Sequence, residues 1–299
     1  MIRNLNQLLE LAKKQETKSL AIAAAEDKSV LNAVAKAKDI GLIKPIYIGN
    51  SDHIKTLATE IGITVNDNEI IHKDDSNIAC LEAVKLVSQG KADLLMKGLV
   101  PTRILLKHVI SNDYGLLSGK LLSHLSIFES PNYHKLLGLT DAAMNIAPSL
   151  SEKTSILKNS VEAFHSLGFK KPKVAVLAAL ENVNLKIPAT TDAAELKKMG
   201  ELHKFGNCIV DGPLALDNAI SKEAAEHKGI VSEVAGDADI LIAPDLNTGN
   251  VLYKAMIFLG NARCAAIIVG SKAPIVLTSR ADSKETKFLS IALGVITAK

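Results

Sequence analysis

Short apolar runs alternate with longer segments of helical periodicity along most of the 299-residue chain, and this alternation constrains the fold most. Among the apolar runs are Ser19–Ala25, Pro45–Ile48 and Ala92–Met96, and helical segments such as Glu26–Ile40 and Asn77–Gln89 lie between them. A repeated succession of strand, helix and strand favours a parallel sheet with right-handed crossovers. The sequence therefore predicts the α/β class.

The residues available for the core support the same class. Aromatic residues make up only 3% of the chain and Trp is absent, so Ala, Val, Ile and Leu must fill the interior. That set suits parallel strands that are covered by helices on both faces. The length fits two α/β domains of ordinary size. We therefore expect two doubly wound, mostly parallel α/β domains.

The alternation is interrupted near the middle of the chain. Two apolar runs, Leu121–Phe128 and Lys135–Leu139, are joined by a segment that contains a turn, which favours a partly antiparallel pair. After these runs the alternation of strands and helices resumes. We expect a first domain of residues 1–120 and 271–299 and an inserted second domain of residues 121–270, with a ligand-binding cleft between the two.

Charge and cysteine content exclude several classes of protein. The net charge of +3 is small and no block of like charges occurs, so nucleic acid is not an expected partner. Cys80, Cys208 and Cys264 are far apart, which predicts neither a disulfide framework nor a metal site and indicates a reducing compartment. No apolar run approaches the roughly 18 residues of a membrane span. We expect a cytoplasmic protein with no membrane partner.

The common nucleotide and hydrolase motifs are absent. No GxGxxG follows a predicted strand, and neither GxxxxGK[ST] nor GxSxG occurs. The eight histidines show no metal-binding spacing, so no metal site is expected. The candidate chemistry must therefore lie in other polar segments.

Polar loops follow many of the predicted strands, and ligands of open α/β sheets bind at the carboxyl ends of strands. Most of these loops also begin a helix, whose free N–H groups suit a phosphate. The loops are Lys97–Arg103, Thr140–Asn145, Glu181–Asn184, Asp211–Pro213, Pro244–Asn250 and Thr278–Ser283.

Each loop also has a purely structural interpretation. Asn247 or Thr248 is a suitable N-cap for a helix over Gly249–Leu259. Asp282 with Glu285 three residues later resembles a capping box at the start of the last helix. Arg103 and Arg280 taken singly are ordinary surface cations.

Three segments together carry a family resemblance. GDADILIAPDLNTGN at residues 236–250, DGPLALD at 211–217 and TSRADS at 278–283 resemble signature segments of the phosphate acetyl/butyryltransferases. Three further segments look more like the butyryl branch of that family: SHLSIFE at 123–129, LTDAA at 139–143 and LAALENVN at 177–184. The resemblance covers nearly the whole chain.

The resemblance implies a reaction in which butanoyl-CoA and phosphate give butanoyl phosphate and CoA, reversibly. It implies a fold like that of the isocitrate and isopropylmalate dehydrogenases, with the active site between two domains. It also implies a homodimer or higher homo-oligomer. The CoA ester and phosphate would be substrates, with no permanently bound cofactor.

The resemblance also assigns catalytic residues. Ser279 and Arg280 match the family's Ser-Arg pair, which would donate to the reacting carbonyl or thiolate and anchor phosphate or CoA. An arginine binds phosphate bidentately, and hydrogen-bond donors stabilise a tetrahedral oxyanion. A base must take the thiol proton in the reverse direction. The acetyl branch has an aspartate where this chain has Thr286, and we assign the base to Asp282, with Glu285 as the neighbouring alternative.

The remaining candidates would bind substrate. Arg103 is the one arginine of the Lys97–Gly98 loop and matches the family's use of first-domain arginines. The other substrate-binding candidates are expected to form one wall of a phosphate and CoA site. They are Asp211, Asp245, Asn247, Thr248 and Gly249.

Three alternative functions stay open at this point. The preferred acyl chain length is not readable from the residues, so a phosphate acetyltransferase is the first alternative. A dehydrogenase of the isopropylmalate type shares the expected fold, although it would need several metal-binding aspartates. A non-catalytic acyl-CoA-binding module is the third, and an intact Ser-Arg loop argues against it.

Overall fold

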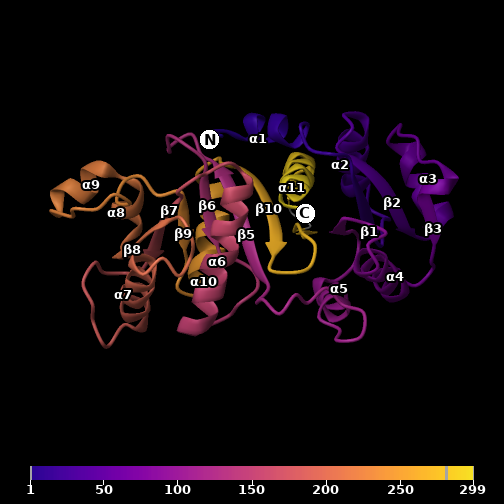
Figure 1. The fold of residues 1–299 in the computed structure, drawn as a ribbon. Helices are drawn as coiled ribbons and strands as arrows, with labels where there is room; N and C mark the ends of the chain where they lie inside the picture. Colours follow the sequence, from indigo (N-terminus) through magenta and orange to yellow (C-terminus); the bar gives the residue numbers. More distant parts are fainter. Residues whose placement is uncertain (1, 280–281, 299) are drawn as a thin grey trace. The chain divides into compact units, whose positions relative to one another are not determined.

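A computed structural model describes residues 2–279 and 282–298 (Figure 1), and the chain divides into two compact α/β units. We call residues 6–120 and 265–299 the outer unit, and residues 1–5 and 121–264 the middle unit. No helix in the described part of the chain is long and apolar enough to cross a membrane.

Parallel strands form most of the sheet in the outer unit. Leu20 to Ala23 are fully buried although successive residues of a strand face opposite sides, so both faces of the sheet are covered. The last strand pairs antiparallel with its neighbour, through Ile268 and Ile275. The strand order is β3 (Ile70–His72), β2 (Ile43–Gly49), β1 (Lys18–Ala23), β4 (Leu94–Lys97), β11 (Ile275–Val276) and β10 (Arg263–Val269, in this unit from residue 265).

In the outer unit α2 packs against α11, and α4 packs against α5. α11 is buried from Thr286 to Ile296, which explains its apolar sequence on every side. Asp27, Asn50 and Asp75 cap α2, α3 and α4 by accepting N–H groups of the first turn. The helical elements are α1 (Leu5–Ala12), α2 (Lys28–Asp39), α3 (Ser51–Glu60), the 3₁₀ turn η1 (Asp67–Glu69), α4 (Ser76–Ser88), α5 (Thr102–Val109) and α11 (Lys284–Thr297).

The middle unit has a second, mostly parallel set of strands. Its first two strands are antiparallel, with Ser126 opposite Leu139, which confirms the partly antiparallel pair expected from the sequence. The other neighbours pair in parallel. The order is β5 (Ser123–Glu129), β6 (Leu137–Thr140), β9 (Ile240–Ile242), β7 (Lys173–Leu177) and β8 (Ile209–Leu214).

Helices of the middle unit also pack against its strands. α6 lies across β5 and β6 (Figure 1) and begins with a capping box made by Ser149 and Glu152. α7 contacts β7 and β8. The helices are α6 (Leu150–Ser166), α7 (Pro188–Glu201), α8 (Leu216–Ile220), α9 (Lys222–His227) and α10 (Leu246–Phe258). Both units are thus mixed α/β with mostly parallel pairing, as the sequence predicts.

Among the element boundaries that differ from the sequence-based expectation, three bear on the candidate loops. Asp211–Pro213 was expected to be a loop after a strand, but it is part of β8, which runs on to Leu214. The register of β8 with β7 shifts, and pairing resumes between Leu177 and Leu214. β8 is the last strand in the order, where Pro213 is tolerated because an edge strand needs fewer N–H donors. The starts of α10 and α11 also differ, because other residues cap them.

Candidate active site

Three family segments meet at one edge of the middle unit. β7, β8 and β9 are parallel neighbours, so their carboxyl ends lie at the same edge of the sheet. Residues 177–184, 211–217 and 244–250 occupy these ends. They contribute to two pockets, which we call the apolar pocket and the polar pocket.

The apolar pocket has a volume of about 690 Å³ and no aromatic residue in its lining. Its wall consists of alanine and branched aliphatic side chains, with three polar residues, Asp245, Asn247 and Thr248, at the beginning of α10. Such a cavity suits a flexible aliphatic group with a polar end. The apolar lining is Leu177, Ala178, Ala179, Ile187, Ala189, Leu216, Pro244, Val251, Leu252 and Ala255.

Asp245 caps α10, and this changes the expected role of its neighbours. Its Oδ1 accepts the N–H of Thr248 at 2.8 Å, while its carbonyl oxygen accepts the N–H of Gly249 at 3.0 Å. The cap is therefore neither Asn247 nor Thr248, and the helix starts at Leu246 rather than Gly249. Asn, Thr and Asp are all good caps, so local sequence could not choose among them. Two of the N–H groups expected to face phosphate are already used inside the protein.

Gly249 allows α10 to approach the loop after β6. A Cβ at this position would lie 2.2 Å from the carbonyl oxygen of Asp141 and 3.0 Å from the Cα of Ala142. Asn250 strengthens the same contact, because its Nδ2 donates to the carbonyl of Ala142 at 3.1 Å. Asp141 is itself buried and accepts the N–H groups of Ala143 and Met144. Gly249 thus shapes the site through a backbone contact.

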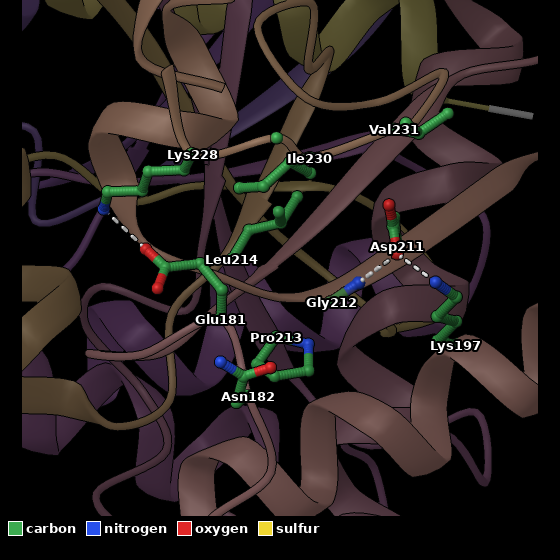
Figure 2. Close-up of a pocket in the computed structure, with 11 residues that line it drawn as sticks. Glu181, Asn182, Lys197, Asp211, Gly212, Pro213, Leu214, Lys228, Ile230 and Val231 are labelled. Atoms are coloured by element: carbon green, nitrogen blue, oxygen red, sulfur yellow. Dashed lines mark hydrogen bonds and ion pairs between the residues drawn. The ribbon is translucent and has the colours of Figure 1, made fainter. Parts of the chain in front are cut away.

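The polar pocket, about 510 Å³, contains two ion pairs, and Figure 2 shows them on opposite sides of the view. Asp211 Oδ1 lies 2.7 Å from Lys197 Nζ and also accepts the N–H of Gly212 at 2.8 Å. Glu181 Oε1 lies 2.7 Å from Lys228 Nζ. Asp211 is therefore at the predicted edge, but its carboxylate is held by a lysine that the sequence did not single out.

The charge state of Glu181 follows from its partners. The Lys228 ammonium lowers the pKa of the Glu181 carboxyl, against the effect of burial, and the buried Asn218 also donates to it. Reciprocally, Glu181 raises the pKa of Lys228. The pocket therefore offers two ammonium groups that are balanced by two carboxylates. Lys197 lies in α7 and Lys228 directly follows α9, and no sequence motif marked either lysine.

The candidate loop before α11 lies in the outer unit. Arg280 falls outside the described residues. Asp282 Oδ2 accepts the N–H of Ser279 at 2.6 Å, and the cap of α11 is Ser283, whose Oγ accepts the N–H of Thr286. The capping box expected from Asp282 and Glu285 is therefore wrong. Asp282 ties the loop back onto Ser279.

Two further positions complete the outer unit. Thr286, at the place of the acetyl branch's aspartate, is buried and hydrogen-bonds with Ser283, so no carboxylate stands there. Arg103 is exposed in the first turn of α5. Among the described residues, no group of three or more His, Cys, Asp or Glu side chains could hold a metal ion.

The carboxyl edge of parallel strands is where open α/β proteins bind ligands, and here it carries an aliphatic pocket beside a pocket with paired charges. Comparison with known proteins identifies the family. The profile of the family described as phosphate acetyl/butaryl transferase matches residues 76–295, and the chain belongs to that family.

Relatives match along the full length. The phosphate butyryltransferase of Clostridium acetobutylicum is 47% identical over 298 residues, covering 100% of this chain and 99% of that protein. The phosphate acetyltransferase of Thermotoga maritima is 43% identical, covering 98% and 99%. The crystal structure of a branched-chain phosphotransacylase from Enterococcus faecalis superposes with a TM-score of 0.82 at 35% identity, covering 94% and 99%. A relative named for butyryl transfer and one named for acetyl transfer are thus similar to this chain to nearly the same degree.

Proposed function

We propose that this chain transfers a short-chain acyl group between coenzyme A and inorganic phosphate, with butanoyl-CoA as the acyl donor. The family match and the full-length relative named phosphate butyryltransferase support the reaction. The observation that carries it is the meeting of three family segments at one strand edge beside an aliphatic pocket. The same match favours a transferase over the dehydrogenase and the non-catalytic binding module.

The chemistry needs charge stabilisation and positioning. A phosphate oxygen attacks the thioester carbonyl carbon, the C–S bond breaks, and CoA leaves as a thiolate. We assign the oxyanion or thiolate donor to Ser279 and the phosphate anchor to Arg280, as the family resemblance implies. In the reverse direction Asp282 takes the thiol proton. Holding both substrates side by side can account for much of the rate.

The proposed substrate-binding residues fall into two groups: those with exposed side chains and those whose side chain or backbone is already used in contacts within the protein. Asn247 and Thr248 are exposed at the mouth of the apolar pocket and present side-chain donors there. Asp245 and Gly249 act by fixing the start of α10, and Asp211 acts by holding Lys197 in the polar pocket. The exposed Arg103 is proposed as an additional anion anchor from α5.

We propose that the acyl chain lies in the apolar pocket, whose lining lacks aromatic side chains. One methylene in such a pocket changes binding by roughly 1 kcal/mol, so discrimination between acyl groups rests on pocket volume. The volume of about 690 Å³ leaves room for more than an acetyl group, and the choice of butanoyl-CoA is proposed from the relative named phosphate butyryltransferase.

Four wider predictions accompany the reaction. The predicted domain boundaries, an isocitrate dehydrogenase-like arrangement, cytoplasmic location and a homodimer remain proposals from the sequence and the family. The homodimer has support from exposed apolar side chains along and just after α10, with Val251, Phe258 and Leu259 at 68%, 70% and 87% exposure. Large exposed apolar side chains that gather on one surface often mark a protein–protein interface.

The direct test is phosphate-dependent release of thiol from acetyl-, propanoyl- and butanoyl-CoA, measured with a disulfide dye. We expect release from all three, with the highest kcat/KM for butanoyl-CoA, and none without phosphate. Lack of phosphate-dependent release from every ester would refute the proposed reaction. A parallel assay with NAD and Mn²⁺ tests the dehydrogenase alternative.

A further inference from the structure

Lys287 is a buried cation behind the loop that carries the Ser-Arg pair. Its residue is only 3% exposed, in an otherwise apolar part of α11. Its Nζ donates to the carbonyl oxygen of Asp282 at 2.8 Å and to that of Ser279 at 3.3 Å. A buried ammonium is costly unless hydrogen bonds satisfy it, so these two carbonyls are strongly held where they are.

The loop is also fastened from its own side. Asp282 Oδ2 accepts the Ser279 N–H, and the Asp282 N–H donates to the Ser279 carbonyl at 3.2 Å. The same carbonyl receives Lys287, so one lysine and one aspartate fix the backbone on both sides of Arg280.

The carboxylate of Asp27, just before the neighbouring helix α2, provides a counter-charge for Lys287. Burial alone would raise the pKa of the Asp27 carboxyl. Hydrogen bonds from Ser29 and Val30 outweigh this effect and lower the pKa, and the positive charge of Lys287 lowers it further. Since α2 and α11 pack together, the carboxylate supplies a counter-charge without forming a direct ion pair in the described contacts. The ammonium therefore keeps its donors for the loop.

We propose that Lys287 is a positioning residue that holds Ser279 and Asp282 in the geometry needed for acyl transfer. This inference rests on the proposed function, and it adds a residue that the family motif does not include. Lys287 acts through the backbone of the loop and need not touch substrate. Its removal should impair catalysis much more than it impairs folding.

Lys287→Met removes the ammonium and keeps the length of the side chain. We expect kcat/KM for phosphate to fall about ten- to a hundredfold, the scale of losing hydrogen bonds to a charged group. The matched control is Lys284→Met, which removes an exposed lysine from the first turn of the same helix and should stay within twofold of wild type. A Lys287→Met enzyme within twofold of wild type would overturn the proposal.

A double-mutant cycle separates positioning from a general loss of active protein. If Lys287 acts by placing Ser279, then Lys287→Met should cost less than threefold once Ser279→Ala is already present, because coupled residues are not additive. A merely structural loss would reduce activity by the same factor in both backgrounds. Equal factors would therefore contradict the positioning role.

Hydrogen exchange gives a readout that does not depend on activity. We expect faster exchange in a peptide covering residues 278–283 of Lys287→Met, with unchanged protection in α2 and β1. Unchanged exchange in that peptide would overturn the inference, even in an active enzyme. Faster exchange in a protein whose wild type lacks phosphate-dependent thiol release would support the fastening of the loop and refute the proposed function instead.

Discussion

Two loops with family motifs lead into helices, and an aspartate fastens each in a different way. In the loop before α10, Asp245 accepts the N–H of Thr248, three residues later, and so caps the helix. In the loop before α11, Asp282 accepts the N–H of Ser279, three residues earlier, and leaves the cap to Ser283. Only the second loop is also held by a buried lysine.

The two loops differ in whether their aspartate contacts are explained by helix capping alone. A capping aspartate satisfies free N–H groups that every helix has, so the first loop is explained without any substrate. The second loop uses a carboxylate and a buried ammonium on backbone that is not helical, at the cost of desolvating a cation. These contacts do not serve to cap a helix, which agrees with the proposal that the geometry of this loop matters for acyl transfer.

The largest expected effect tests the chemical role of the second loop. Arg280→Ala should lower kcat/KM by about a hundredfold or more, because it removes the cation proposed to anchor the reacting phosphate. The midpoint of thermal unfolding should stay near that of wild type. Steady-state kinetics with butanoyl-CoA and phosphate measure the first quantity and circular dichroism the second. Near-wild-type turnover would contradict a catalytic role for the loop before α11 and leave both loops with structural roles only.

Gly249→Ala tests the structural role of the first loop, with the next largest effect. The new Cβ would meet the Asp141 carbonyl oxygen at 2.2 Å, so α10 or the β6 loop must shift. Overpacking of this kind costs about 1–3 kcal/mol in the free energy of unfolding. Urea titration measures this, and Asn247→Ala, an exposed change in the same turn, serves as the control. A variant as stable as wild type would contradict the tight backbone contact.

The regular elements were readable from sequence because their signals are local. Alternating apolar runs and helical periods placed most strands and helices of both units, and the turn between Leu121–Phe128 and Lys135–Leu139 indicated the antiparallel pair. The end of β8 was not readable, because its last residues pair across a register shift with β7. Such a shift depends on the partner strand and leaves no local pattern.

The site shows the same limit. Asp211 and Asp245 were identified by motif. The pairing of Asp211 with Lys197 comes from a tertiary contact. The capping role of Asp245 is local, but Asn247 and Thr248 are also good caps, so the sequence alone could not assign it. Lys287 does carry a signal in the sequence, because eleven uncharged residues follow it, from Phe288 to Ala298. A lysine at the start of so apolar a helical run is a candidate for burial with specific partners.

Asp245→Ala tests the helix cap of the first loop, and its expected effect on stability is smaller than that of Gly249→Ala. Removing the cap leaves the Thr248 N–H without its acceptor and should lower the free energy of unfolding by about 1 kcal/mol. Asp245→Asn keeps a capping oxygen and should lose less. Urea unfolding of the two variants measures the difference. If both lose the same amount, the hydrogen bond to Thr248 is not what holds the loop.

The smallest expected effect extends the comparison to a third loop, after β7. A lysine also holds this loop, but Lys228 pairs with the side chain of Glu181, whereas Lys287 binds the backbone carbonyl of Asp282. Lys228 is 44% exposed, so solvent weakens its interaction with Glu181. Lys228 and Asn218 lower the pKa of Glu181 against the effect of burial. The resulting stabilisation is therefore fully present above the ordinary glutamate pKa and disappears as the pH falls through the lowered folded value.

Glu181→Gln should accordingly reduce stability at pH 7 by less than Asp245→Ala, and the difference from wild type should shrink as acid protonates Glu181. Urea unfolding at pH 7 and in a series down to pH 2 measures this dependence. Glu195→Gln is the matched control, because its ion pair with Lys198 joins two exposed side chains within one helix. A deficit that stays constant with pH would show that the amide disturbs packing and that the Lys228 pair is not what stabilises this loop. Fastening by lysine would then be special to the loop before α11, where the ammonium is buried.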